Sequence, residues 1–130
     1  MKRYLVFGSN SFSGANFVKF LINKNIQTIG ISRSSQLKKI YLPYFKSKKI
    51  KKFTFYKADI NKDIKKIKKI IQKYKPSYIV NYIAQGMVAE SWANPEDWYQ
   101  TNIVSQTNLY KVLSNYRFIK KIIHVTTPEV

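Results

Sequence analysis

The sequence predicts an α/β fold in which one parallel sheet carries helices on its faces. Short runs of β-branched and aromatic residues alternate with longer segments of helical periodicity, and this alternation is typical of βαβ units. The chain has 130 residues, of which 45% are apolar, four are proline and four are glycine. This length and composition predict one folded domain, residues 1–130, with a core of its own.

Five segments have the composition of strands bounded by turn residues. They are Arg3–Phe7, Gln27–Ser32, Phe53–Lys57, Tyr78–Ile83 and Lys121–Thr126. Helical patterns fill the intervals at Gly14–Lys24, Lys62–Lys73 and Pro95–Asn115, with a weak, irregular helix within Ser34–Tyr44. The basic segment Lys46–Lys52 is expected to connect the second and third strands.

Two of these helices carry particularly clear signals. In Lys62–Lys73, isoleucines recur at three- and four-residue spacing while the lysines face elsewhere. Pro95–Asn115 has a start signal: Asn94 can cap the helix, and Pro95 takes the first helical position. The two acidic residues that follow complement the positive end of the helix dipole.

Composition excludes several classes of function. The chain has no cysteine and one histidine, so zinc clusters, thiol nucleophiles and disulfides are not expected, and no metal site is predicted. The apolar run Tyr4–Phe7 is too short for a secretion signal. No segment approaches the roughly 18–20 apolar residues that cross a bilayer, so we expect a cytoplasmic protein without membrane contact.

A formal net charge of +18 is the strongest compositional bias. A basic chain of this kind often binds nucleic acid. Only three of the 24 basic residues are arginines, however, and the lysines are spread along the whole chain. Base-reading surfaces favour arginine for its bidentate geometry. We therefore expect solvated lysine faces and no specific nucleic-acid partner, and a small basic nucleic-acid-binding module remains the alternative of another class.

A candidate anion site follows the first strand, where the chain reads Gly8-Ser9-Asn10-Ser11-Phe12-Ser13-Gly14 before a helix begins. A glycine-containing turn at a helix N-terminus directs backbone amides and the helix dipole at an anion. Dinucleotide-binding sheets hold a diphosphate in this way. Gly8 would permit the tight turn and Gly14 the close packing of helix on strand, although an ordinary strand-to-helix loop is the competing interpretation.

This turn resembles that of the extended short-chain dehydrogenase/reductase family, whose fingerprint is Gly-x-x-Gly-x-x-Gly after the first strand. The resemblance implies a Rossmann-type sheet truncated after its fifth strand, with Ser11, Phe12 and Ser13 beside the diphosphate. Ser11 departs from the middle glycine of the fingerprint, so either the loop shifts or the hydroxyl donates a hydrogen bond. Asp59-Ile60 resembles the family's pair beside the adenine ring; otherwise Asp59 caps the next turn.

The segment from Asn81 to Trp92 resembles nucleotide-sugar 4,6-dehydratases of the dTDP-glucose or GDP-mannose type. Ala84 and Gln85 match the family's Ala-Ala-Gln, which lies along the coenzyme, and Asn102 matches a recurring helix asparagine. Periodicity alone would place Asn102 on a solvent-facing helix surface. The resemblance implies a nucleotide-sugar substrate and a parent protein that is a homodimer.

The end of the chain, His124 to Val130, resembles the family's Ser-Thr-Asp-Glu segment. Thr127 matches the hydroxyl that bonds the hexose 4-oxygen, and Glu129 matches the base that removes the C5 proton. Pro128 replaces the acidic residue of the dTDP-glucose enzymes. An epimerase or a UDP-glucuronate decarboxylase stays open as an alternative, since decarboxylases can share the Thr-x-Glu segment.

The choice between NAD and NADP depends on the residues after the second strand, where the chain reads Ser32-Arg33-Ser34-Ser35. An acidic residue here would bind a ribose 2′-hydroxyl and repel a 2′-phosphate. Arg33 and the neighbouring serines instead offer partners to a phosphate, which favours NADP. The alternative is NAD, with Arg33 stacked on adenine.

The family's Tyr-x-x-x-Lys base lies on a later helix. Tyr44 to Lys48 and Tyr116 to Lys120 have this spacing but precede Thr127, so both are expected to be chance occurrences. We therefore expect the chain to bind coenzyme without turnover, as the coenzyme-binding portion of a lyase.

Overall fold

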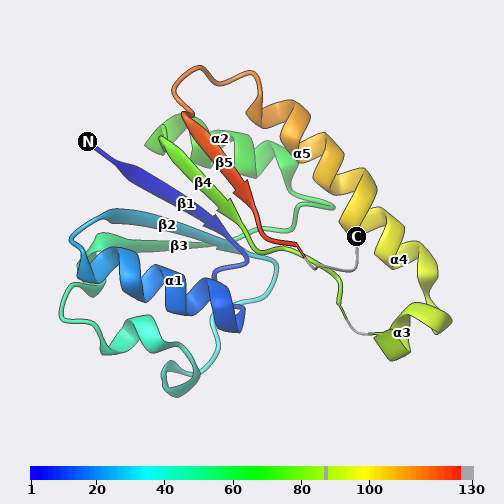
Figure 1. Ribbon diagram of the computed structural model, residues 1–130, viewed down its shortest axis with the longest axis horizontal. Coiled ribbons are helices and arrows are strands. Elements are labelled where there is room, and N and C mark those ends of the chain that lie inside the picture. Colours follow the sequence, from blue (N-terminus) through cyan, green and yellow to red (C-terminus); the bar gives the residue numbers. More distant parts are fainter. Residues whose placement is uncertain (87, 127–130) are drawn as a thin grey trace.

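The computed structural model describes residues 1–86 and 88–126. Its centre is a five-stranded sheet in the order β3-β2-β1-β4-β5, with every neighbouring pair parallel (Figure 1). The strands are β1 (Arg3–Phe7), β2 (Gln27–Ser32), β3 (Phe53–Lys57), β4 (Tyr78–Asn81) and β5 (Lys121–His124). This arrangement confirms the predicted Rossmann-type α/β fold.

The first three strands have the predicted bounds, whereas β4 and β5 each end two residues early. The side chain of Asn81 explains the first difference, because its oxygen accepts the Ile83 amide at 2.9 Å and takes that amide out of the ladder. β5 ends at His124, which pairs with Asn81 in the last register position of β4. The buried Asn81 therefore ends β4 and pairs with the last residue of β5.

Helices cover both faces of the sheet and produce two cores. α1 (Phe12–Asn23) lies on one side, and α2 (Ile64–Tyr74) and α5 (Gln106–Leu113) lie on the other (Figure 1). Side chains alternate along β1, so that Leu5 and Phe7 join the core beneath α2 and α5 while Val6 joins the core beneath α1. The predicted helices Gly14–Lys24 and Lys62–Lys73 are thus present with small shifts at their ends.

The weak helix predicted within Ser34–Tyr44 is wrong. The chain there forms two short 3₁₀ turns, Lys39–Tyr41 and Pro43–Lys46, separated by Leu42 in an extended conformation. Pro43 removes an amide donor and disfavours a helical conformation at Leu42. Leu42 and Tyr44 are instead fully buried in the α1 core. The connector that follows holds one more such turn, Ile50–Lys52.

The predicted helix Pro95–Asn115 begins at Pro95 but is not uniform. It consists of α4 (Pro95–Tyr99), a π-helical stretch (Gln100–Ser105) and α5, and an unpredicted helix α3 (Val88–Ala93) precedes it. Asn94 occupies the capping position without a side-chain capping bond. Among the described residues, no helix has the length and hydropathy to cross a bilayer.

Replacing Ile71 tests the core beneath α2. Ile71→Ala is expected to lower the free energy of unfolding by about 2–5 kcal/mol, because Ile71 is fully buried between this helix and the sheet. Urea denaturation followed by circular dichroism measures the change. The exposed neighbour provides the control, since Gln72→Ala should change the free energy by less than about 0.5 kcal/mol. Equal effects at the two positions would contradict the assignment.

Candidate functional site

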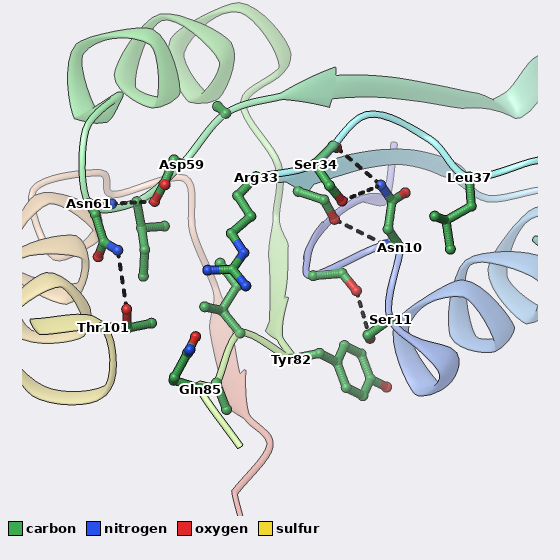
Figure 2. Close-up of a pocket in the computed structure, with 16 residues that line it drawn as sticks. Asn10, Ser11, Arg33, Ser34, Leu37, Asp59, Asn61, Tyr82, Gln85 and Thr101 are labelled. Atoms are coloured by element: carbon green, nitrogen blue, oxygen red, sulfur yellow. Dashed lines mark hydrogen bonds between the residues drawn. The ribbon is translucent and has the colours of Figure 1, made fainter. Parts of the chain in front are cut away.

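A pocket of about 230 Å³ lies where the loops after β1, β2, β3 and β4 meet (Figure 2). The carboxyl ends of parallel strands gather at one edge of a sheet, and ligands bind open α/β sheets in that crevice. Thr101, from the π-helical stretch, completes the wall. Eight of the residues predicted to bind coenzyme line the pocket: Gly8, Ser11, Ser32, Arg33, Asp59, Ile60, Ala84 and Gln85.

The remaining predicted residues have different positions. Phe12, Ser13 and Gly14 open α1 beside the pocket, and Asn102 lies behind Gln85. Thr127 and Glu129 fall outside the described residues. Among the residues that are described, no group of three or more His, Asp or Glu side chains is arranged to hold a metal ion.

The turn after β1 depends on its two glycines. Gly8 has φ of +75°, a left-handed conformation that glycine adopts without strain, and its amide donates to the Ile31 carbonyl at 2.8 Å. Gly14 packs directly on the turn, since a Cβ atom at this position would overlap the Gly8 carbonyl oxygen. The start of α1 therefore lies against the end of β1, as predicted for Gly14.

Ser11 is the N-cap of α1. Its Oγ accepts the Gly14 amide at 3.0 Å and donates to the Gly8 carbonyl at 2.7 Å. The side chain is thus accommodated by bonds within the turn. A capping serine contributes about 1 kcal/mol to helix stability.

Two amides at the start of α1 are left for an anion. The first amides of a helix have no acceptor within it. Here the Ser11 amide donates to the Gly8 carbonyl and the Gly14 amide to Ser11 Oγ. The amides of Phe12 and Ser13 have no acceptor among the described residues. They lie at the positive end of the helix dipole, where an anion is stabilised.

The loop after β2 is tied to this turn by Asn10. The Asn10 amide donates to Ser32 Oγ at 3.0 Å, and its side-chain nitrogen donates to the carbonyls of Ser34 and Ser35 at 3.2 and 3.0 Å. Between these anchors, the Arg33 side chain extends across the pocket (Figure 2). Asn10 was not among the predicted site residues, although an asparagine in a turn is a recurrent partner for nearby backbone groups.

The loop after β3 brings Asp59 to the opposite wall (Figure 2). Its Oδ1 accepts the Asn61 amide at 2.8 Å, so this carboxylate caps the turn and lines the pocket. The side-chain nitrogen of Asn61 in turn donates to Thr101 Oγ1 at 3.1 Å. Both interpretations of Asp59 are therefore compatible with its position.

Asn102 holds the loop after β4. Its side chain accepts the Gln85 amide at 2.8 Å and donates to the Gln85 carbonyl at 3.1 Å, so it is half-buried and does not face solvent. A second pair of bonds fixes the start of the loop, where Asn81 accepts the Ile83 amide and Gln106 donates to the Ile83 carbonyl. Residues far along the chain thus set the position of Ala84 and Gln85.

Two buried oxygens at the pocket indicate that it is built for a ligand. Asn10 Oδ1 and Asn61 Oδ1 are shielded from solvent and have no donor among the described residues. A buried acceptor without a donor costs about 1–3 kcal/mol. Together with the turn that only glycine permits at Gly14, they fit a ligand that carries an anion and several hydrogen-bond donors.

Neither Tyr-x-x-x-Lys spacing belongs to this site. Tyr44 is buried in the α1 core, where its hydroxyl accepts from Gln36 and burial raises its pKa. Tyr116 packs against Phe118 at the core beneath α2 and α5. Tyr82 does line the pocket, but burial raises its pKa, which opposes formation of a phenolate. The raised pKa values of Tyr44 and Tyr82 disfavour a role for either as a base.

Comparison with known families agrees with this arrangement. A model of the GDP-mannose 4,6 dehydratase family matches residues 5–130. The chain belongs to this family. The resemblance to extended dehydrogenase/reductases seen in the sequence is thereby confirmed.

The relatives of this chain include epimerases and dehydratases. A UDP-glucuronate 4-epimerase of Thermodesulfobacterium geofontis is 26% identical over 133 residues, and a probable dTDP-glucose 4,6-dehydratase of Sinorhizobium fredii is 25% identical over 140 residues. These alignments cover 100% and 98% of this chain but only 41% and 38% of the two relatives. The chain therefore spans about two fifths of their length.

Solved structures of epimerases share the fold. The UDP-glucose 4-epimerase of Thermotoga maritima, solved with UDP-glucose, is 27% identical with a TM-score of 0.79, over 96% of this chain and 38% of that one. The Bifidobacterium longum enzyme, solved with NAD+ and UDP, is 22% identical with a TM-score of 0.85, over 99% of this chain and 38% of that one.

Replacing Gly14 tests the contact between α1 and the turn. Gly14→Ala is expected to lower the free energy of unfolding by about 1–3 kcal/mol, since the new methyl group collides with the Gly8 carbonyl. The sign of this change in the free energy of unfolding is informative. Helix propensity alone would make the alanine variant more stable by about 1 kcal/mol. Thermal or urea denaturation measures it. Gly86→Ala is the matched control, because a Cβ there meets nothing within 4 Å. A more stable Gly14→Ala variant would refute the packing argument.

Proposed function

We propose that the chain is the dinucleotide-binding portion of a nucleotide-sugar 4,6-dehydratase. One observation carries this proposal: a single pocket combines Ser11, the N-cap of α1, with the Arg33 loop, Asp59 and the Ala84–Gln85 segment. Family membership supports a nucleotide sugar as the substrate of the whole protein. The activity belongs to that whole protein, since the chain spans only 41% and 38% of the curated relatives described above.

Each wall of the pocket has a part of the coenzyme to bind. The amides of Phe12 and Ser13 would receive the diphosphate, and Asp59 with Ile60 would lie beside the adenine. Gln85, held by Asn102, would lie along the nicotinamide half. When bound, a nicotinamide supplies a hydride acceptor for sugar C4 and returns the hydride at C6.

Residues at the end of the chain decide between dehydratase and epimerase. Glu129 would remove the C5 proton during loss of water, and Thr127 would hold the 4-oxygen of the sugar. These two roles are assigned from the sequence alone. The dehydratase is favoured because the family's epimerases usually lack a carboxylate at the Glu129 position, and an epimerase or decarboxylase is the alternative outcome.

The charge pattern at the ribose end supports NADP as the coenzyme. Arg33 extends into the pocket, and its neighbours in the sequence are Ser32, Ser34 and Ser35, with no acidic residue among them. A 2′-phosphate there gains a charge-assisted hydrogen bond and meets no carboxylate from this loop. A 2′-hydroxyl lacks the acidic partner that commonly binds it.

A fluorescence titration with NADPH tests the binding function. The chain is expected to bind one equivalent saturably, with an affinity that changes less than about tenfold between 50 and 200 mM salt. Double-stranded DNA is the comparison ligand, for which a protein with 6–10 phosphate contacts loses about 10³–10⁵ in affinity over that range. Salt-sensitive DNA binding without any response to NADPH would favour the nucleic-acid-binding alternative.

Replacing Arg33 tests the choice of coenzyme. Arg33→Gln is expected to weaken NADPH binding about 10- to 100-fold, the value of a hydrogen bond to a charged group, while NADH binding changes little. Arg117→Gln, at an exposed arginine that does not line the pocket, is the control. Equal weakening of both coenzymes would mean instead that Arg33 stacks on adenine.

A further inference from the structure

Asn10 contacts the chain on both sides of Arg33. Its backbone amide donates to the Oγ of Ser32, the residue before Arg33, at 3.0 Å. Its side-chain nitrogen donates to the carbonyl of Ser34, the residue after Arg33, at 3.2 Å, and to that of Ser35 at 3.0 Å. Figure 2 shows the Asn10 side chain reaching this segment from the turn after β1. Asn10 therefore bonds to both neighbours of Arg33, to the side chain of Ser32 and to the carbonyl of Ser34.

The side chain of Arg33 is left available by this arrangement. Arg33 is exposed and lines the pocket, while its two neighbours are fixed by Asn10. A long, flexible cation loses rotamer freedom when it binds a phosphate, and fixing its backbone in advance reduces that loss. Asn10 thus joins the turn that would bind the diphosphate to the residue that would bind a 2′-phosphate.

The side-chain oxygen and nitrogen of Asn10 have different surroundings. Oδ1 is buried without a donor among the described residues, and it lies on the side of Leu37 (Figure 2). An unpaired buried acceptor is unfavourable for stability. The contacts to the loop after β2 are made by the nitrogen, and a shorter or apolar residue would not make them.

We propose that Asn10 is a positioning residue for coenzyme selectivity: it holds Arg33 in place for a 2′-phosphate. This inference rests on the proposed function, because it concerns the same coenzyme site. The proposal adds a residue from the turn after β1 to the loop after β2 as a determinant of selectivity for the 2′-phosphate.

The test compares two probes that differ only in the 2′-phosphate, adenosine 2′,5′-bisphosphate and adenosine 5′-monophosphate. Isothermal titration calorimetry measures the affinity of each for the unaltered chain and for Asn10→Ala and Asn10→Leu. The unaltered chain is expected to prefer the bisphosphate by about tenfold or more, and both variants to lose most of that preference. The affinity for the monophosphate, which lacks the 2′-phosphate, should fall by a smaller factor in these variants than the affinity for the bisphosphate.

Two comparisons separate positioning from packing. Leucine restores the bulk of asparagine without its hydrogen bonds, so a preference recovered in Asn10→Leu would overturn the proposal. Asn16→Ala is the matched control, because within the described part of the chain the Asn16 side chain bonds to the Phe12 carbonyl of its own helix alone, and Asn16 does not line the pocket. A loss of preference in this control equal to that in Asn10→Ala would also overturn it.

A double variant provides the decisive readout. If Asn10 acts through Arg33, adding Asn10→Leu to Arg33→Gln causes no further loss of preference, whereas independent residues give additive losses. Circular dichroism verifies that each variant is folded; if Asn10→Ala is unfolded, the leucine variants carry the test. Additive losses overturn the inference.

The outcomes also distinguish this inference from the proposed function. If the unaltered chain binds the bisphosphate and NADPH but Asn10 variants keep the preference, only the inference fails. Equal affinity of the unaltered chain for both probes overturns the inference while coenzyme binding stands. If the unaltered chain binds neither probe nor NADPH, the proposed function fails and the inference fails with it.

Discussion

The close approach of Gly14 to the Gly8 carbonyl is the contact on which the site depends. It allows α1 to begin directly above the end of β1, with Ser11 bonded between the two glycines. This contact thereby places the amides of the first turn of α1 beside the pocket. Any side chain at position 14 would push the helix away and move those amides with it. The pocket walls contributed by the other loops are arranged around this fixed start.

Much of the fold could be predicted because local sequence and tertiary structure agree. In β1, β2 and β3 the β-branched and aromatic runs end at polar or glycine residues, so their bounds are visible in the sequence. In α2 the isoleucine spacing defines the buried face directly. The weak helix predicted within Ser34–Tyr44 was wrong, because Leu42 and Tyr44 are buried from non-helical turns around Pro43.

The residues that line the candidate site could be predicted from the sequence, but the hydrogen bonds that hold its loops could not. Gly8, Arg33, Asp59 and Gln85 could be found because each follows a strand and lies where chains of this family place coenzyme contacts. Asn10 and Asn102 act on backbone groups that lie 24 or 25 and 17 residues away along the chain. Pairings over such separations depend on the folded topology, and no periodic pattern encodes them. The side-chain bonds that hold the loops are therefore visible only in three dimensions.

The π-helical stretch has a consequence for how this segment tolerates change in length. A π-helical turn accommodates one more residue than an α-helical turn. Removing a residue from Gln100–Ser105 would return the stretch to α-helix and rotate everything on its N-terminal side by about 100°. Thr101 would leave Asn61, and Asn102 would leave Gln85. The extra residue therefore fixes the rotational register of this segment, and insertions or deletions are not expected to be tolerated here.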